Sequence, residues 1–145
     1  FDTYRFSDQS VFNEQELAGL NTFTQAGCMQ CHMGPDMAGP PPLARGTGFY
    51  QEFPKFKDSL LIAKYKLAED NGRYQTSHQE SDRHVYRVPS LRNIKETAPY
   101  FHNGAVDTLE EAARVCAELQ NDRQLNDQEV SDITTFLATL SGEFP

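Results

Sequence analysis

The stretch Cys28-Met29-Gln30-Cys31-His32 decides the fold of this chain. Cys-x-x-Cys-His is the attachment signature of a c-type haem. In this signature two thioether bonds join Cys28 and Cys31 to the haem vinyl groups, and His32 follows at once to bind the iron. The spacing is required because both sulfurs and the imidazole must reach one flat macrocycle. We therefore predict one covalently bound haem c, held by Cys28, Cys31 and His32.

Two other sites use a Cys-x-x-Cys pair, namely redox disulfides and zinc centres. A redox motif usually lies in a βαβ context, and no such alternation of strands and helices surrounds this one. A zinc centre needs a second ligand pair, whereas the third cysteine, Cys116, stands alone. The sequence therefore favours haem attachment over a redox disulfide and over a zinc centre.

Length and composition limit the class of protein. The chain has 145 residues, which predicts a single domain over residues 1–145. It carries 13 lysine and arginine residues against 21 aspartate and glutamate residues, for a formal net charge of −8, which argues against nucleic acid and anionic membranes as partners. Hydrophobic residues make up only 38%, low for a chain that builds its own core, and a haem would supply apolar mass.

Location follows from the same motif. No run of roughly 18 apolar residues is present, so we expect no membrane span. Haem is attached to such motifs outside the cytoplasm. We therefore expect a periplasmic or other extracytoplasmic protein whose signal peptide was removed before Phe1.

A helix is predicted to lead into the motif. Asn13 and Glu16 have the spacing of a capping box, apolar residues follow at helical intervals, and the helix should end near Ala26, before Gly27. A loop rich in proline and glycine, which includes Gly39-Pro40-Pro41-Pro42, follows the motif. It contains Met33 and Met37, which lie too close to His32 in sequence to cross easily to the other haem face.

Three more helices are expected. Asp58 is the predicted cap of one that ends at Asn71-Gly72, and Thr108 with Glu111 forms a capping box for the next. The apolar face of that second helix is Leu109, Ala112, Ala113, Cys116 and Leu119.

The last helix is the most clearly marked. Asn126 and Glu129 form its capping box, Leu125 and Val130 occupy the staple positions, and Gly142 ends it. Its apolar stripe is Val130, Ile133, Phe136, Leu137 and Leu140. The elements together predict an all-α, cytochrome c-like domain with one covalently bound haem and long loops.

Beyond the haem motif, three stretches resemble a known family. They run over residues 87–94 (Arg-Val-Pro-Ser-Leu-Arg-Asn-Ile), 97–104 (Thr-Ala-Pro-Tyr-Phe-His-Asn-Gly) and 108–112 (Thr-Leu-Glu-Glu-Ala). Together with residues 27–35 and 136–142 they resemble the C-terminal, electron-transfer haem domain of the bacterial dihaem cytochrome c peroxidases. The related amine-maturation enzymes share the pattern.

The chain departs from this family at two points. The family reduces hydrogen peroxide at an N-terminal haem, and the domain that carries it has no counterpart here. The C-terminal haem of the family is held by His and Met, and the residue at the Met position is Cys116. The resemblance thus implies Cys116 as the sixth iron ligand opposite His32, whereas the residues alone favour a buried, inert cysteine. A bound thiolate would stabilise ferric iron and lower the reduction potential.

Two further residues are candidates for the haem surroundings. Arg92 suits a charge-assisted bond to a haem propionate, and a surface salt bridge is the equal alternative. His102 stands beside two aromatic residues, and the resemblance does not make it an iron ligand. We expect a hydrogen-bonding role for it near the haem.

These observations favour a low-potential monohaem cytochrome with His/Cys ligation that transfers electrons, rather than an enzyme. One alternative is a haem protein or sensor that binds NO or CO through a labile Cys116, and another is a peroxidase-related subunit. The expected partners are a redox protein and, because a lone domain exposes the surface its neighbour covered, a second subunit. That subunit would make a homodimer or a heterodimer with another cytochrome. The heterodimeric His/Cys monohaem cytochromes of anammox bacteria are similar in kind.

Overall fold

The computed structural model describes residues 1–40 and 47–142. Its longest helices are α2 (Glu14–Gln25), α5 (Leu109–Asn121) and α6 (Asp127–Ala138). Shorter helices are α1 (Asp2–Phe6), α3 (Leu60–Lys64) and α4 (Tyr74–Ser77). Short 3-10 turns cover Gln9–Val11, Cys28–Gln30, Glu80–Asp82 and Ile94–Glu96. Strand β1 (Tyr50–Glu52) pairs antiparallel with β2 (Val85–Arg87).

Local sequence signals set the bounds of α2 as predicted. Asn13 accepts a hydrogen bond from the Glu16 amide, and the Glu16 carboxylate accepts one from the Asn13 amide, so the capping box is complete. The helix ends at Gln25, and Gly27 follows with a φ of 82°, a left-handed conformation that glycine adopts without strain. This turn delivers the chain into the haem motif.

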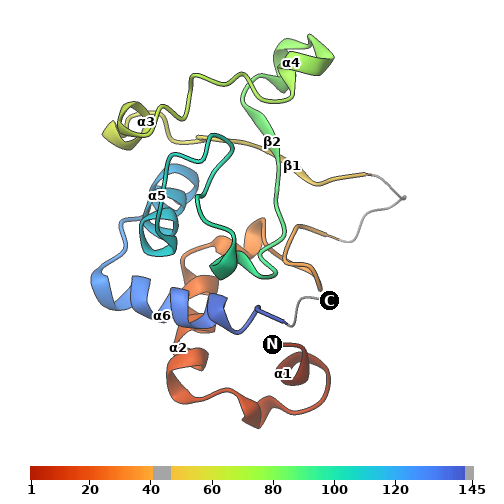
Figure 1. Ribbon diagram of the computed structural model, residues 1–145, viewed down its shortest axis with the longest axis vertical. Coiled ribbons are helices and arrows are strands. Elements are labelled where there is room, and N and C mark those ends of the chain that lie inside the picture. Colours follow the sequence, from red (N-terminus) through yellow and green to blue (C-terminus); the bar gives the residue numbers. More distant parts are fainter. Residues whose placement is uncertain (41–46, 143–145) are drawn as a thin grey trace.

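The main core lies where α2 crosses α6, on the side of the molecule that also holds α1 (Figure 1). The predicted stripe of α6 is buried at every position, and the two staple residues Leu125 and Val130 are buried as well. Phe136 is completely buried and packs its ring against Phe23 of α2. The capping box of Asn126 and Glu129 is also confirmed.

Gly19 allows α2 and α6 to approach closely. A Cβ atom at this position would lie 2.1 Å from the carbonyl oxygen of Asp132 on α6. We therefore expect Gly19→Ala to lower the free energy of unfolding by about 3 kcal/mol, near the upper end for an overpacked core and well above the roughly 1 kcal/mol that alanine adds to a helix. Urea denaturation measures the difference.

Gly142→Ala is the matched control, because nothing among residues 1–40 and 47–142 lies within 4 Å of a Cβ atom there. Equal stability of the Gly19 and Gly142 variants would show that the two helices do not cross at Gly19.

The structure corrects several predicted elements. The all-α prediction is wrong at the two strands, which have three residues each and are too short to show an alternating pattern. Helix α3 is capped by Ser59 rather than Asp58 and ends at Lys64, well before Asn71. Helix α6 ends at Ala138, ahead of Gly142. Of the predicted proline-rich loop, Pro41 and Pro42 lie outside the described residues.

At α5 only half of the predicted capping box forms. The Thr108 hydroxyl accepts a hydrogen bond from the Glu111 amide. The Glu111 carboxylate accepts instead from the Tyr65 hydroxyl at 2.5 Å and pairs with Lys64. Glu111 therefore joins α5 to the end of α3.

Within residues 1–40 and 47–142, no helix is long and apolar enough to cross a membrane.

Candidate haem-binding site

The attachment motif is fixed against the end of α5. Cys28 opens a short 3-10 turn directly after Gly27. The last carbonyl groups of α2 are bonded from the far end of α5: Asn121 donates to the Ala26 carbonyl at 2.9 Å, and Arg123 donates to the Gln25 carbonyl at 2.8 Å. The helix that carries Cys116 is thereby joined to the residues that precede the motif.

His32 is oriented by the loop that follows it. Its Nδ1 lies 2.9 Å from the Met37 carbonyl oxygen. A carbonyl oxygen can only accept, so Nδ1 carries the proton and Nε2 keeps its lone pair. Burial lowers the pKa of His32, although the carbonyl groups of Met37 and Pro89 oppose this shift. A neutral imidazole with a fixed tautomer is the form that binds a metal.

The two methionines of the loop lie differently. The Met37 side chain is buried in the main core with Phe12 and Phe23, while its backbone takes a φ of 51° and presents the carbonyl to His32. Met37 thus acts through its backbone. Met33 is half-buried.

The three cysteines form no disulfide bond with one another. Burial raises the pKa of Cys28 to about 11 and also raises that of Cys31. Cys116 as a residue is half-buried, but protein surrounds its sulfur closely enough that burial raises its pKa to about 12. The thiols of Cys28 and Cys31 push the pKa of Cys116 in the same direction.

The face of α5 that carries Cys116 is incompletely covered. Leu109, Ala113 and Cys116 follow one another at helical spacing and are all half-buried, whereas Ala112, Val115 and Leu119 are buried. Met29 of the motif is half-buried too. Two thiols, a neutral imidazole and a half-covered apolar stripe make up a donor set and a surface that fit a haem.

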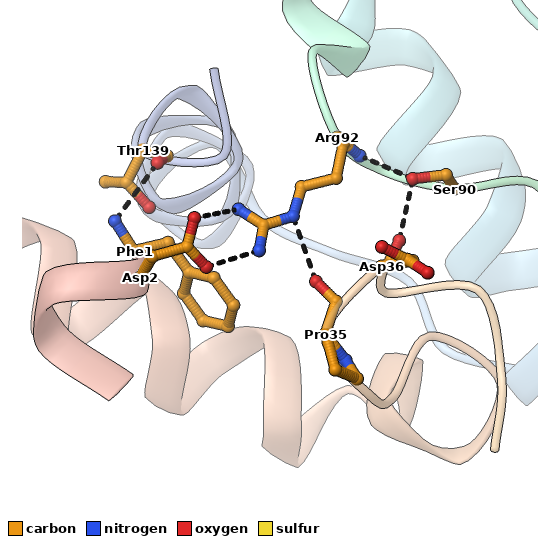
Figure 2. A network of polar contacts seen from close by, with 7 residues as sticks. All are labelled: Phe1, Asp2, Pro35, Asp36, Ser90, Arg92 and Thr139. Carbon is orange, nitrogen blue, oxygen red and sulfur yellow. Dashed lines mark hydrogen bonds and ion pairs between the residues drawn. The ribbon is translucent and has the colours of Figure 1, made fainter. Parts of the chain in front are cut away.

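Arg92 connects the loop after the motif to the N-terminal helix (Figure 2). Its Nε donates to the Pro35 carbonyl at 2.9 Å, and its two terminal nitrogens bond the carboxylate of Asp2. The hydrogen bond from Arg92 lowers the pKa of the Asp2 carboxyl group. Ser90 completes the connection by donating to the Asp36 carbonyl at 2.7 Å. The structure therefore contains the salt-bridge alternative for Arg92, and its link to a propionate stays a prediction.

His102 belongs to an aromatic and polar group away from α2. Its ring stacks on Tyr86 at 4.3 Å between centroids. The Tyr86 hydroxyl donates to the Asp70 carbonyl at 2.9 Å, and the same carbonyl lies 2.8 Å from His84 Nδ1. The expected hydrogen-bonding role of His102 near the haem stays a prediction.

Sequence reasoning missed the residues that position the motif. In the sequence, nothing distinguishes Asn121 and Arg123 from the residues at any other helix end. No sequence pattern indicates the role of the Met37 carbonyl, because it belongs to the backbone. In the described part of the chain, no group of three or more His, Cys, Asp or Glu side chains is arranged to hold a bare metal ion.

A Cys-x-x-Cys-His turn at the end of a helix, with a neutral histidine and a half-covered apolar stripe beside it, is typical of helical domains that bind a c-type haem. No family model matches the chain. The chain is 41% identical over 145 residues to cytochrome c551 peroxidase of Nitrosomonas europaea, which covers all of the chain and 40% of that protein. It is 33% identical over 145 residues to cytochrome c551 peroxidase of Pseudomonas aeruginosa, again over its full length and 39% of the relative.

A more distant relative is the methylamine utilization protein MauG of Methylorubrum extorquens, 25% identical over 154 residues, with 99% of the chain and 39% of that protein covered. The whole chain is thus homologous to one portion of the bacterial cytochrome c peroxidases and MauG, which confirms the family resemblance of its motifs. The chain spans about two fifths of the length of these relatives.

Solved structures agree on the fold. A MauG-like protein associated with microbial copper homeostasis matches with a TM-score of 0.72 at 24% identity, over 98% of this chain and 51% of that one. The diheme peroxidase BthA of Burkholderia thailandensis matches with a TM-score of 0.64 at 23% identity, over 97% and 45%.

Proposed function

We propose that this chain is a monohaem c-type cytochrome domain that transfers electrons, with His32 and Cys116 as axial ligands and a low reduction potential. The observation that supports the proposal is the place of Cys116 on the half-covered face of α5, a helix whose end is bonded to the residues that precede the motif. The electron-transfer haem domain at the C-terminal end of the family's peroxidases is the proposed counterpart, with residues 1–145 forming one domain.

In this proposal Cys28 and Cys31 anchor the haem through thioether bonds, and His32 binds through Nε2. The haem supplies a one-electron couple whose potential the axial ligands set. The Cys116 thiol, whose pKa is about 12 in the free chain, must lose its proton to bind iron. The resulting thiolate favours ferric iron, and the potential is therefore low. We place the protein outside the cytoplasm, with a redox protein as its partner.

Binding of a diatomic gas is a second candidate. Burial raises the pKa of the Cys116 thiol in the free chain and so favours its protonated form. A Cys116 ligand that took up a proton would leave its position at the iron to NO or CO. A peroxidase-related role is the enzymatic alternative, supported by the names of the curated relatives.

A subunit interface is proposed as well, since Phe6 is 67% exposed on α1.

A redox titration followed by visible absorbance tests the function. We expect a single one-electron transition at low potential, and no shift of the reduced spectrum when CO is added. A CO-dependent spectral shift would favour gas binding instead, and turnover of hydrogen peroxide by the isolated protein would favour the peroxidase alternative.

A further inference from the structure

Two neighbouring carbonyl groups of the loop after the motif accept hydrogen bonds from side chains far along the chain. Arg92 Nε donates to the Pro35 carbonyl at 2.9 Å, across 57 residues. The Ser90 hydroxyl donates to the Asp36 carbonyl at 2.7 Å, across 54 residues. Both bonds are visible in Figure 2. We call Ser90 and Arg92 the loop anchors, because they hold two successive peptides of this loop.

The loop anchors stand on a fixed segment of backbone. Leu91, which lies between them, is buried in the main core. On one side of the segment the Val88 amide donates to the Phe49 carbonyl at 2.8 Å, and on the other the Asn93 amide donates to the Leu140 carbonyl at 3.2 Å. The anchors can therefore hold the loop in place rather than move with it.

Each loop anchor is oriented by a second contact. The Ser90 oxygen accepts from the Arg92 amide at 3.1 Å, and its one proton is left for the Asp36 carbonyl. The terminal nitrogens of Arg92 bond the carboxylate of Asp2, and the guanidinium group lies 5.2 Å from the centre of the Phe1 ring. Because the guanidinium group is planar, these contacts also fix the direction of its Nε–H bond.

The next carbonyl of the loop is the one that contacts His32. The Met37 carbonyl oxygen lies 2.9 Å from His32 Nδ1. Met37 has a φ of 51°, a conformation that is costly for any residue but glycine and that persists only where the surroundings enforce it. Its buried side chain fixes the position of the residue, whereas the direction of its carbonyl depends on the adjoining peptides. The loop anchors hold the two peptides before it.

We propose that the loop anchors are positioning residues for His32: they hold the loop so that the Met37 carbonyl accepts from Nδ1, and they thereby lower the reduction potential. The proposal rests on the function proposed above, in which His32 binds iron. A hydrogen bond at Nδ1 makes the imidazole a stronger donor to the metal. A stronger donor favours ferric iron, so a weaker hydrogen bond raises the potential.

A propionate partner for Arg92 predicts the opposite sign. A guanidinium group beside the haem would add positive charge near the iron and favour the ferrous state, so its removal would lower the potential. Ser90 carries no charge, and with a propionate partner alone its removal would leave the potential unchanged. The two roles of Arg92 can therefore be distinguished by direction.

Reduction potentials of the haem-loaded protein are the first test. Ser90→Ala and Arg92→Gln should each shift the equilibrium toward ferrous iron, and the double variant should shift it about tenfold, which is a rise of roughly 60 mV for a one-electron couple. Ser90→Thr keeps the hydroxyl group and should retain the potential of the unmodified protein. A fall in Arg92→Gln, or no change in Ser90→Ala, would overturn the proposal.

Arg83→Gln is the matched control. Arg83 binds the Glu80 carboxylate through two nitrogens, donates to the Asn71 side chain at 2.8 Å and lies 4.0 Å from the centre of the Tyr74 ring. It thus has the same kinds of contact as Arg92, with partners that lie between residues 71 and 80. Its replacement should leave the potential unchanged. An equal rise in the Arg83 and Arg92 variants would overturn the proposal, because a loss of stability alone would then explain both.

Exchange of the His32 Nδ1 proton with solvent is the second test, and it does not depend on the potential. NMR of the ferrous protein with ¹⁵N-labelled histidine should show this exchange accelerating about tenfold in the double variant, because the Met37 carbonyl no longer protects the proton. Unchanged exchange would overturn the proposal. Faster exchange in a protein without a reversible one-electron transition would contradict the proposed function alone. A reversible transition at low potential that neither anchor shifts would contradict the positioning role alone.

Discussion

Cys116→Met should raise the reduction potential by at least about 0.1 V, within the roughly 0.8 V that axial ligands span in haem proteins. Helix α5 is fastened at both ends: Thr108 caps its start, and Asn121 bonds the Ala26 carbonyl at its end. A methionine at position 116 therefore starts from the same backbone position. A neutral thioether no longer favours ferric iron as a thiolate does, so the ferrous state gains stability. Spectroelectrochemistry measures the shift.

Met33→Leu is the matched control, since Met33 is a half-buried methionine directly after the motif. It should leave the potential unchanged. A potential that moves in the Met33 variant and stays constant in the Cys116 variant would identify Met33 as the ligand and Cys116 as a core residue.

Removing both attachment cysteines should have the second large effect. In Cys28→Ser with Cys31→Ser, the intact mass should fall by one haem relative to the unmodified protein, after correction for the substitutions, and acid–acetone should extract all remaining haem. The fold should also lose stability, because the stripe of Leu109, Ala113 and Cys116 on α5 would lose its permanent cover.

Single variants refine this result. Cys28→Ser and Cys31→Ser each retain one thioether and should resist extraction. The double variant should also melt at a lower temperature than either. An unmodified protein whose mass equals that of the bare chain would show that the motif carries no covalent haem.

The parts of the fold that the sequence predicts are those encoded by near neighbours. Asn13 with Glu16 and Asn126 with Glu129 each form a capping box across three residues, so the starts of α2 and α6 can be read directly. The stripe of α6 is periodic, and each of its members is buried. The family resemblance is confirmed over the whole chain for a related reason, because its motifs are short and contiguous.

The parts that sequence reasoning missed depend on partners far away in the chain. Glu111 has the spacing for a capping box, but its carboxylate accepts a hydrogen bond from the Tyr65 hydroxyl, 46 residues away, instead. Arg92 donates hydrogen bonds to the carboxylate of Asp2, 90 residues away, and to the carbonyl of Pro35. Asn121 reaches Ala26 across 95 residues and thereby sets the motif beside α5. Such contacts leave no periodic or spaced pattern from which they could be predicted.

Electron paramagnetic resonance of the ferric protein tests the central claim, ligation by His32 and Cys116, most directly. The account predicts a low-spin signal with the narrow spread of g values that thiolate ligation gives, and its replacement by a high-spin or water-bound signal in Cys116→Ala. A signal typical of His/Met or bis-histidine ligation, unchanged in Cys116→Ala, would contradict it.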